Sequence, residues 1–287
     1  MDVAAQDTSS QEKTAAPVLR IFSYLPNPRV WKALIAARLC NVDVQVIGAR
    51  PGELGGWLWD FDARPLADDE RTADSPHARI ARRGFSGTLY KTDAFLQAHP
   101  FGTVPAAFSP DGAVGVFESN SILRAVARRG TRTCRLYGND DYEASRIDGF
   151  LDAGLVFARE AQVYLLDIKT LSADNYARMA AAYEFYLSGI EASLAQGNAF
   201  IAGAALSIAD ISFVCDLAQF LREGHSLDEL ERQGLPAISA EGPAQYPRAF
   251  AHLLTLAASP AFAAELGTYL DWYRRALAAE AASRETT

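Results

Sequence analysis

The sequence is poor in cysteine. It has three cysteines in 287 residues, and no two of them have the C-x-x-C spacing of a redox dithiol or of a zinc site. They are Cys40, Cys134 and Cys215. The spacing excludes a thioredoxin-type redox motif and predicts no metal site, and so few cysteines are typical of a reducing compartment. We therefore expect a cytoplasmic protein.

Positive charge and long apolar runs are also lacking. The chain has 27 lysines and arginines against 35 aspartates and glutamates, for a formal net charge of −8. A protein that neutralises nucleic-acid phosphates needs a broad basic face, which this composition does not supply. No apolar run reaches the roughly 20 residues that cross a bilayer. The sequence therefore predicts neither nucleic acid nor membrane as a partner.

The length and the patterning predict two domains, at about 150 residues for each. Residues 1–16 are polar without an apolar core, which predicts a disordered tail and not a signal peptide. Residues 17–130 mix strand and helix patterns, whereas residues 142–277 are almost wholly helical in pattern. Residues 278–287 are expected to form a second tail.

The first domain opens with a strand, a helix and a second strand. Apolar residues 18–24 predict the first strand, the spacing over 29–39 predicts the helix, and residues 42–47 predict a buried parallel strand. Later strands are expected at Val104 and over 114–117. The domain therefore begins as a β-α-β unit and ends in a hairpin and a helix.

An unusually long segment, about 48–98, separates the second strand from the hairpin. Segments of this length inside a compact domain are usually functional or disordered. It carries Trp57, Trp59 and Phe85, and a short helix is expected over 93–97. We predict that it folds over the adjacent cleft and shapes substrate choice. A subunit contact is the alternative, because exposed aromatic clusters also mark interfaces.

Two short motifs flank the hairpin. The Val104-Pro105 bond precedes a strand, and proline cannot donate a ladder hydrogen bond, so the residue before it presents unpaired backbone groups. An extended peptide can pair there. Glu118 and Ser119 open the following helix, whose free N–H groups suit a carboxylate beside an ammonium. Either motif alone is typical of an edge strand or a helix cap, but both in this order favour a peptide-binding site.

The second domain reads as a succession of helices. Ser172 caps one that reaches Ala195, and Ser207 to Asp210 is an S-x-x-D capping box. The other helices are expected over 142–169, 211–221, 246–256 and 260–275.

The two motifs together resemble the glutathione-binding half of the glutathione transferases, whose usual form is N-P-x-G-K-V-P-A, a hairpin and then E-S-x-A-I. His99 and Thr103 depart from that form. Further segments resemble the transferase-like domain of elongation factor 1-gamma. These segments are 31–37, 88–92, 95–96, 117–120 and 213–217. The resemblance spans about residues 18–275, with 50–85 unmatched.

The resemblance implies an α/β plus all-α fold, with a thioredoxin-like N-terminal domain and a helical transferase-type C-terminal domain. It implies glutathione as cosubstrate and a homodimer, or a heterodimer with a related chain. The implied enzyme attacks a hydrophobic, aromatic electrophile with the glutathione thiolate, by conjugation or by thiolytic ether cleavage as in bacterial lignin β-etherases. The alternative is a non-catalytic interaction module, as in elongation factor 1-gamma.

Candidate site residues follow from the same resemblance. For thiol activation we rank Asn27 first, Ser23 second and Tyr24 third, although each has an ordinary role in ending a strand or capping a helix. Glutathione itself is assigned to Arg29, Thr103, Val104, Pro105, Glu118 and Ser119, with a cis Val104–Pro105 bond.

A hydrophobic substrate site is expected between the domains. An aromatic stripe at helical spacing is more often core, so a packing role is the alternative for these side chains. The residues assigned to this site are Trp57, Trp59, Phe85, Tyr142, Phe150 and Phe157.

Overall fold

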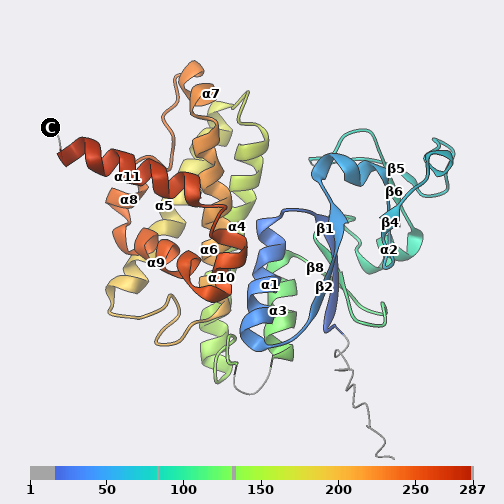
Figure 1. The fold of residues 1–287 in the computed structure, drawn as a ribbon, viewed down its shortest axis with the longest axis horizontal. Helices are drawn as coiled ribbons and strands as arrows, with labels where there is room; N and C mark the ends of the chain where they lie inside the picture. The colour runs from blue at the N-terminus through green and yellow to red at the C-terminus, as the bar shows by residue number, and fades with distance from the viewer. Residues whose placement is uncertain (1–16, 83, 131–133, 286–287) are drawn as a thin grey trace, which may run out of the picture.

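The computed structural model describes residues 17–82, 84–130 and 134–285. The tail expected over 1–16 lies outside these residues. Two bodies lie side by side, one of mixed strands and helices and one of helices alone (Figure 1). The described chain therefore has the two-part α/β plus all-α architecture that the resemblance implies.

The first body is built on a four-stranded sheet. Across it the order is β2 (Val44–Ala49), β1 (Leu19–Tyr24), β7 (Ala106–Phe108) and β8 (Gly115–Phe117). Strand β1 is parallel to β2 and antiparallel to β7. Helices α1 (Pro28–Cys40) and α3 (Ser119–Arg129) cover the face that lies toward the helical body. This arrangement is the thioredoxin-like sheet that was expected.

The long segment forms a second sheet, which the sequence analysis did not foresee. Its order is β4 (Arg64–Pro65), β3 (Trp57–Trp59), β6 (Thr88–Lys91) and β5 (Ala78–Ile80), with two short 3-10 turns, η1 (Pro51–Gly56) and η2 (Asp68–Glu70). Strands of two to four residues are too short to produce a readable alternation of apolar side chains. Helix α2 (Asp93–Ala98) follows, close to the range expected for it.

This second sheet covers the face of the main sheet that lies away from α1 and α3 (Figure 1). Phe22 and Phe108 of the main sheet share a small apolar core with Trp59, Leu89 and other side chains of the segment. Neighbouring Ile21 points instead into the larger core with α1. The alternation follows from the two-residue period of a strand.

The second body is a bundle of helices. They are α4 (Asp141–Leu166), α5 (Ala173–Ala195), α6 (Ile208–Phe220), the 3-10 turn η3 (Leu221–His225), α7 (Leu227–Arg232), α8 (Gly242–Gln245), α9 (Pro247–Ala258), α10 (Pro260–Leu266) and α11 (Asp271–Glu285). The single helix expected over 260–275 is thus two helices. The tail expected over 278–287 is helical through Glu285, and residues 286–287 lie outside the described part.

The capping box before α6 is a buried polar anchor of the bundle. Asp210 is fully buried and accepts hydrogen bonds from the backbone N–H groups of Ser207 and Ile201, each at 2.9 Å. His252 Nε2 lies 2.8 Å from the same carboxylate. These contacts tie α6 to the preceding loop and to α9, and the capping box expected at Ser207 to Asp210 is present.

Two distant cysteines meet at the edge of the first domain. Cys40 ends α1, and its thiol is hydrogen-bonded to that of Cys134. The pKa of Cys40 is raised to about 12, mainly because the thiol is buried and in part because of this hydrogen bond. Both thiols and that of Cys215 are free. Within the described ranges, no group of three or more histidine, cysteine or acidic side chains is placed to hold a metal ion.

In the described part of the chain, no single helix is long and apolar enough to cross a membrane. The pair α9 and α10 reaches that length and composition only jointly, with a bend of 93° between the two helices.

Candidate functional site

The strand register brings the separate sequence motifs to one edge of the main sheet, by which we mean the end at which β1 and β8 finish and β7 begins. Phe22 of β1 pairs with Ala106 of β7, and Ala106 pairs in turn with Phe117 of β8. The residues that follow Phe22, the Val-Pro pair that precedes Ala106 and the Glu-Ser pair that follows Phe117 therefore all lie at that edge. Three segments separated by up to about 95 residues in sequence form one site.

The Val-Pro segment presents free backbone groups at this edge. The Val104–Pro105 peptide is cis, as the resemblance implied. Val104 is half-buried and makes no backbone hydrogen bond to any described residue, because β7 begins only at Ala106. Its N–H and C=O remain available to an added peptide strand.

The Glu-Ser segment has an unusual backbone. Glu118 caps α3 with φ 68° and ψ 127°, and it is one of two non-glycine residues at positive φ in the described chain. Such a conformation costs on the order of 1–3 kcal/mol and tends to occur at functional sites. The Glu118 side chain is exposed, and Ser119 is half-buried at the first position of the helix. A carboxylate acceptor and the free N–H groups of the helix thus lie together.

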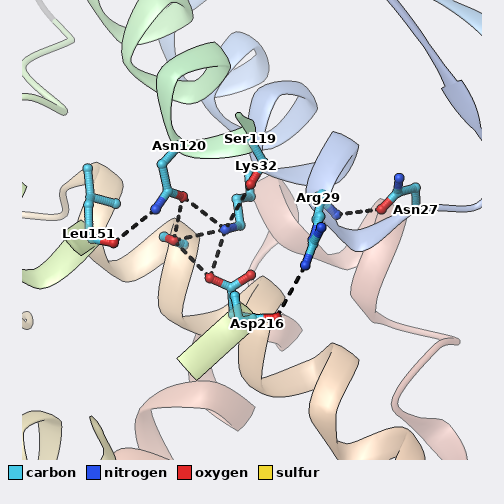
Figure 2. A network of polar contacts seen from close by, with 9 residues as sticks. Asn27, Arg29, Lys32, Ser119, Asn120, Leu151 and Asp216 are labelled. Atoms are coloured by element: carbon cyan, nitrogen blue, oxygen red, sulfur yellow. Dashed lines mark hydrogen bonds and ion pairs between the residues drawn. The ribbon is translucent and has the colours of Figure 1, made fainter. Parts of the chain in front are cut away.

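A buried lysine of α1 contacts the first turn of this helix (Figure 2). Lys32 of α1 donates to Asp216 Oδ2 at 2.7 Å, Asn120 Oδ1 at 2.9 Å and Ser212 Oγ at 3.0 Å. Its ammonium also lies 3.5 Å from Ser119 Oγ. The side chains of Lys32 and Asp216 are only 1% and 2% exposed. The Lys32 ammonium therefore joins the two domains directly behind the candidate site, through the ion pair to α6 and through hydrogen bonds to α3.

The sequence analysis did not identify this network. The available signal was Asp216 itself, an ionisable residue within the apolar run 211–221. A charge in such a run is rarely buried without a partner. The partner lies 184 residues away, and no local pattern points to it.

The three thiol-activating candidates differ in position. Asn27 and Ser23 are fully buried, and Asn27 Nδ2 donates to Ser23 Oγ at 3.0 Å. Asn27 Oδ1 accepts from the backbone N–H of Arg29 at 2.9 Å, so this residue is the N-cap of α1. Tyr24 is half-buried and lines a cavity. Of the three candidates, Tyr24 lines this cavity, whereas Asn27 and Ser23 are buried, and the choice among them stays a prediction.

That cavity lies between the two domains and measures about 200 Å³. Besides Tyr24, it is lined by the end of α4 and by the end of α6 with the turn that follows. These lining residues include Gln162, Leu165, Leu166, Gln219, Arg222 and His225.

Two basic residues near the edge have structural partners. Arg29 donates from Nη2 to the carbonyl of Ala158 in α4 at 3.2 Å, which is a contact between the two domains. Lys91 donates to the carbonyl of Gly102 at 2.7 Å, and burial lowers its pKa. Lys91 thus holds the turn that leads into Thr103 and Val104.

The insertion aromatics of the expected substrate site are not among the residues that line the cavity. Trp59 is only 1% exposed and belongs to the small core of the first domain. Phe85 packs edge-on against Trp59 at 5.4 Å, and Trp57 lies 6.1 Å from Phe22. These side chains pack on the apolar face of the main sheet that α1 and α3 leave uncovered, but Trp57 and Phe85 are only half-buried, so their assignment to a substrate site stays a prediction.

The aromatics of the long helix α4 are divided among three environments. Phe157 is fully buried and stacked on Tyr186 at 5.1 Å, so it is a core residue. Tyr142 is 89% exposed at the start of the helix. Phe150 lines an apolar groove of about 460 Å³ between α4 and α5, far along the bundle from the cavity. None of the three lines the inter-domain cavity.

No family model matches the chain. Among curated proteins, it is 26% identical over 231 residues to the glutathione S-transferase-like protein FUS3 of Gibberella moniliformis, covering 77% of this chain and 84% of that protein. It is 28% identical over 218 residues to elongation factor 1-gamma of Artemia salina, covering 75% of this chain but only 41% of that longer protein.

Solved structures show the same architecture. The glutathione transferase URE2P8 of Phanerochaete chrysosporium, solved with oxidized glutathione, superposes with a TM-score of 0.60 at 12% identity, covering 91% of this chain and 99% of its own. A glutathione S-transferase of Methylobacillus flagellatus with glutathione bound gives a TM-score of 0.56 at 15% identity, covering 86% of this chain and 98% of its own. The chain has the glutathione transferase fold. The resemblance inferred from its motifs is thereby confirmed.

Within this glutathione transferase fold, the inter-domain cavity and the α4–α5 groove differ in their chemistry. The inter-domain cavity combines aliphatic with polar and basic side chains, whereas the α4–α5 groove is almost wholly apolar and includes Phe150 and Phe185. A mixed cavity with a few convergent polar groups is typical of a small-molecule site. An open apolar groove is typical of a protein interface.

Proposed function

We propose that the protein is a glutathione transferase that uses the glutathione thiolate against a hydrophobic electrophile. One observation carries the proposal. The strand register gathers Tyr24, the free backbone of Val104 and the strained Glu118 at one sheet edge. A tripeptide with a free α-amino and α-carboxylate group matches the donors and acceptors at that edge.

Each residue along the edge is proposed to bind a different part of glutathione. Glu118 accepts from the ammonium of the γ-glutamyl residue, and Ser119 with the helix N–H groups binds its carboxylate. Val104 pairs through its backbone with the cysteinyl residue, held in place by Pro105 and Thr103. Tyr24 donates its hydroxyl to the thiolate, which favours the ionised form and lowers the thiol pKa. Orientation of this nucleophile against the electrophile supplies most of the rate gain.

The test of this function is calorimetric titration with glutathione, followed by turnover of 1-chloro-2,4-dinitrobenzene. Both binding and turnover are expected. Aryl ethers are the next class to assay, since the same thiolate would displace a phenolate in place of chloride. If the folded protein does not bind glutathione, the proposal that it is a glutathione transferase is refuted.

The likeness to elongation factor 1-gamma supports a second candidate, a non-catalytic interaction module. The same fold then serves assembly, because fold alone does not determine function. This candidate requires that glutathione not bind, and that the protein be recovered with a stable protein partner.

Tyr24→Phe is expected to reduce turnover at neutral pH roughly 10- to 100-fold, the loss of a hydrogen bond to a charged group worth about 1.5–3 kcal/mol. Glutathione affinity should change little. The pH profile of kcat/KM is the measurement, and its lower limb should move to higher pH because the thiol pKa rises. Asn27→Ser, which preserves an N-cap acceptor, is the control. A larger loss in Asn27→Ser than in Tyr24→Phe would restore Asn27 as the thiol donor.

We also propose that a second copy of the chain covers the α4–α5 groove. Phe185 in this groove is 67% exposed, and Phe101 in the first domain is 65% exposed. An isologous pair presents the same surface from both copies, so that each groove meets apolar side chains of its partner. Covering this groove, which measures about 460 Å³, removes its apolar surface from water and so favours the association.

Gly189→Arg is expected to convert the dimer to a monomer. Gly189 lines the groove, and a Cβ there meets no atom within 4 Å, so the new side chain fits the single chain but fills the groove. Light scattering after size exclusion measures the mass, and thermal unfolding checks the fold. Ser188→Arg, one residue away on the same helix and exposed, is the matched control. Equal mass for both variants and the parent would place the subunit contact elsewhere.

A further inference from the structure

The inter-domain cavity has one aliphatic and one basic side. Leu165 and Leu166 at the end of α4 contribute the aliphatic side. Arg222 and His225 contribute the basic side from η3. Residues three apart in a 3-10 turn are eclipsed, so these two side chains share one face of the turn.

Packing fixes this turn against the last helix. His225 lies over the ring of Trp272, with 4.3 Å between ring centroids. A Cβ on Gly224 would come within 2.6 Å of the same Trp272 ring, so the turn approaches the ring as closely as glycine allows. The turn that carries the basic side of the cavity is therefore fixed by packing, while Arg222 and His225 themselves are exposed.

Arg222 is a cation without a counter-ion in the part of the chain that the structure describes. It makes no ion pair there, and two carboxylates that follow it in sequence, Glu223 and Glu229, contact other groups. Glu223 is fully buried and accepts hydrogen bonds from Tyr164 and Ser239, at 2.6 Å each. Glu229 is paired with Arg232. An unpaired guanidinium beside a cavity is suited to bind an external carboxylate.

A further polar group lies close by. The hydroxyl of Tyr269 is buried and has no hydrogen-bond partner among the described residues. Burial raises the pKa of Tyr269 to about 12, against the opposing charge of Arg222 nearby, so the hydroxyl stays a neutral donor. Tyr269 is not among the residues that line the cavity, so its hydroxyl is not part of the proposed anion site.

We infer that the electrophilic substrate carries an anionic group, a carboxylate on an aromatic body, which Arg222 and His225 bind while the ring lies against Leu165 and Leu166. This inference rests on the proposed function and names the substrate class of the same cavity. The aliphatic side accepts the ring, and the basic side orients it so that the reacting carbon faces the thiolate near Tyr24.

A matched pair of aryl chlorides tests the inference: neutral 1-chloro-2,4-dinitrobenzene and anionic 4-chloro-3,5-dinitrobenzoate. In both reactions the thiolate sulfur forms a bond to the ring carbon, the C–Cl bond breaks, and chloride leaves with the electron pair. The thiol proton goes to solvent. After division by the uncatalysed rates, the parent protein should prefer the benzoate by about tenfold in kcat/KM, as a charge-assisted contact allows.

Three variants identify the residue responsible. Arg222→Gln should abolish the preference and leave kcat/KM for the neutral chloride within about twofold, while Arg222→Lys should retain part of it. Arg232→Gln removes another exposed arginine, already paired with Glu229, and should change nothing. An unchanged preference in Arg222→Gln overturns the inference. So does a raised KM for glutathione with the preference intact, because the anion bound by Arg222 is then a carboxylate of glutathione.

Binding of the two reaction products gives a readout independent of turnover. The parent should bind the carboxylated glutathione conjugate about tenfold more tightly than S-(2,4-dinitrophenyl)glutathione, and Arg222→Gln should bind both alike. Equal affinities in the parent overturn the substrate class. Absence of turnover with a retained difference in affinity overturns the catalytic function instead.

Discussion

Lys32→Met is expected to lower the free energy of unfolding by about 3–5 kcal/mol. The substitution removes the ammonium at the centre of the inter-domain network and leaves the Asp216 carboxylate, 2% exposed, without its cation. The second oxygen of Asp216 already has no partner among the described residues. A buried carboxylate that has lost its only charged partner retains the full cost of desolvation.

The double variant Lys32→Met with Asp216→Leu separates loss of charge from loss of packing. Replacing both members of a buried pair by apolar residues of similar volume is often neutral or stabilising. We expect the double variant to regain most of the stability that the single variant loses. Urea unfolding followed by circular dichroism measures all three free energies. Equal destabilisation in the single and double variants would mean that the pair contributes packing only.

The same substitutions have a second expected effect. Lys32 also contacts Asn120 and Ser119 at the start of α3. The stable double variant should therefore fold but bind glutathione more weakly, because the first turn of α3 is no longer held. Conformational rigidity of the site and stability of the fold depend here on the same ammonium. Unchanged glutathione affinity in the folded double variant would assign Lys32 to stability alone.

Replacement of Glu118 and Ser119 by alanine is expected to reduce glutathione affinity by at least 100-fold. Each side chain is proposed to make a charge-assisted bond worth about 1.5–3 kcal/mol with the γ-glutamyl end. Calorimetric titration measures the loss. Affinity equal to that of the parent would refute the placement of the γ-glutamyl group at this helix.

Glu118→Gly distinguishes binding from folding at this position. Glutamate at φ 68° is strained, whereas glycine adopts positive φ freely. The variant should unfold at the same or higher denaturant concentration than the parent, with a gain of up to about 1 kcal/mol, and should still lose glutathione affinity. A loss of both stability and affinity would indicate that the carboxylate supports the fold.

Local sequence patterns were sufficient for the main sheet and for several helices of the bundle, but not for the second sheet. Pro28 follows an asparagine cap at the start of α1, and Ser172 and Ser207 cap helices where the sequence placed them. Cap and turn chemistry involves residues three or four apart, so it can be read from a short window. The two motifs that flank the hairpin were recognisable for the same reason.

Local patterns failed where packing on a distant element decided the outcome. Trp59 and Phe85 are large and follow glycine-rich turns, which suits an exposed binding loop as well as a buried sheet. Trp59 is a core residue, and the half-buried Phe85 packs against the same core, because the main sheet presents Phe22 and Phe108 on an otherwise uncovered face. Strands as short as those of the second sheet carry no period of their own.

The sequence by itself determined that this chain has a thioredoxin-like sheet and a helical bundle, and it located the two motifs, at Val104 and at Glu118, on which the proposed peptide-binding edge depends. Only the tertiary structure decided which side chain at the end of β1 reaches the cavity. Ser23 and Tyr24 are adjacent, and successive residues of a strand point to opposite faces. Which face borders the cavity depends on where α4 and α6 pack, and that contact joins residues more than a hundred positions apart. The pairing of Lys32 with Asp216 depends on the same docking of the two domains.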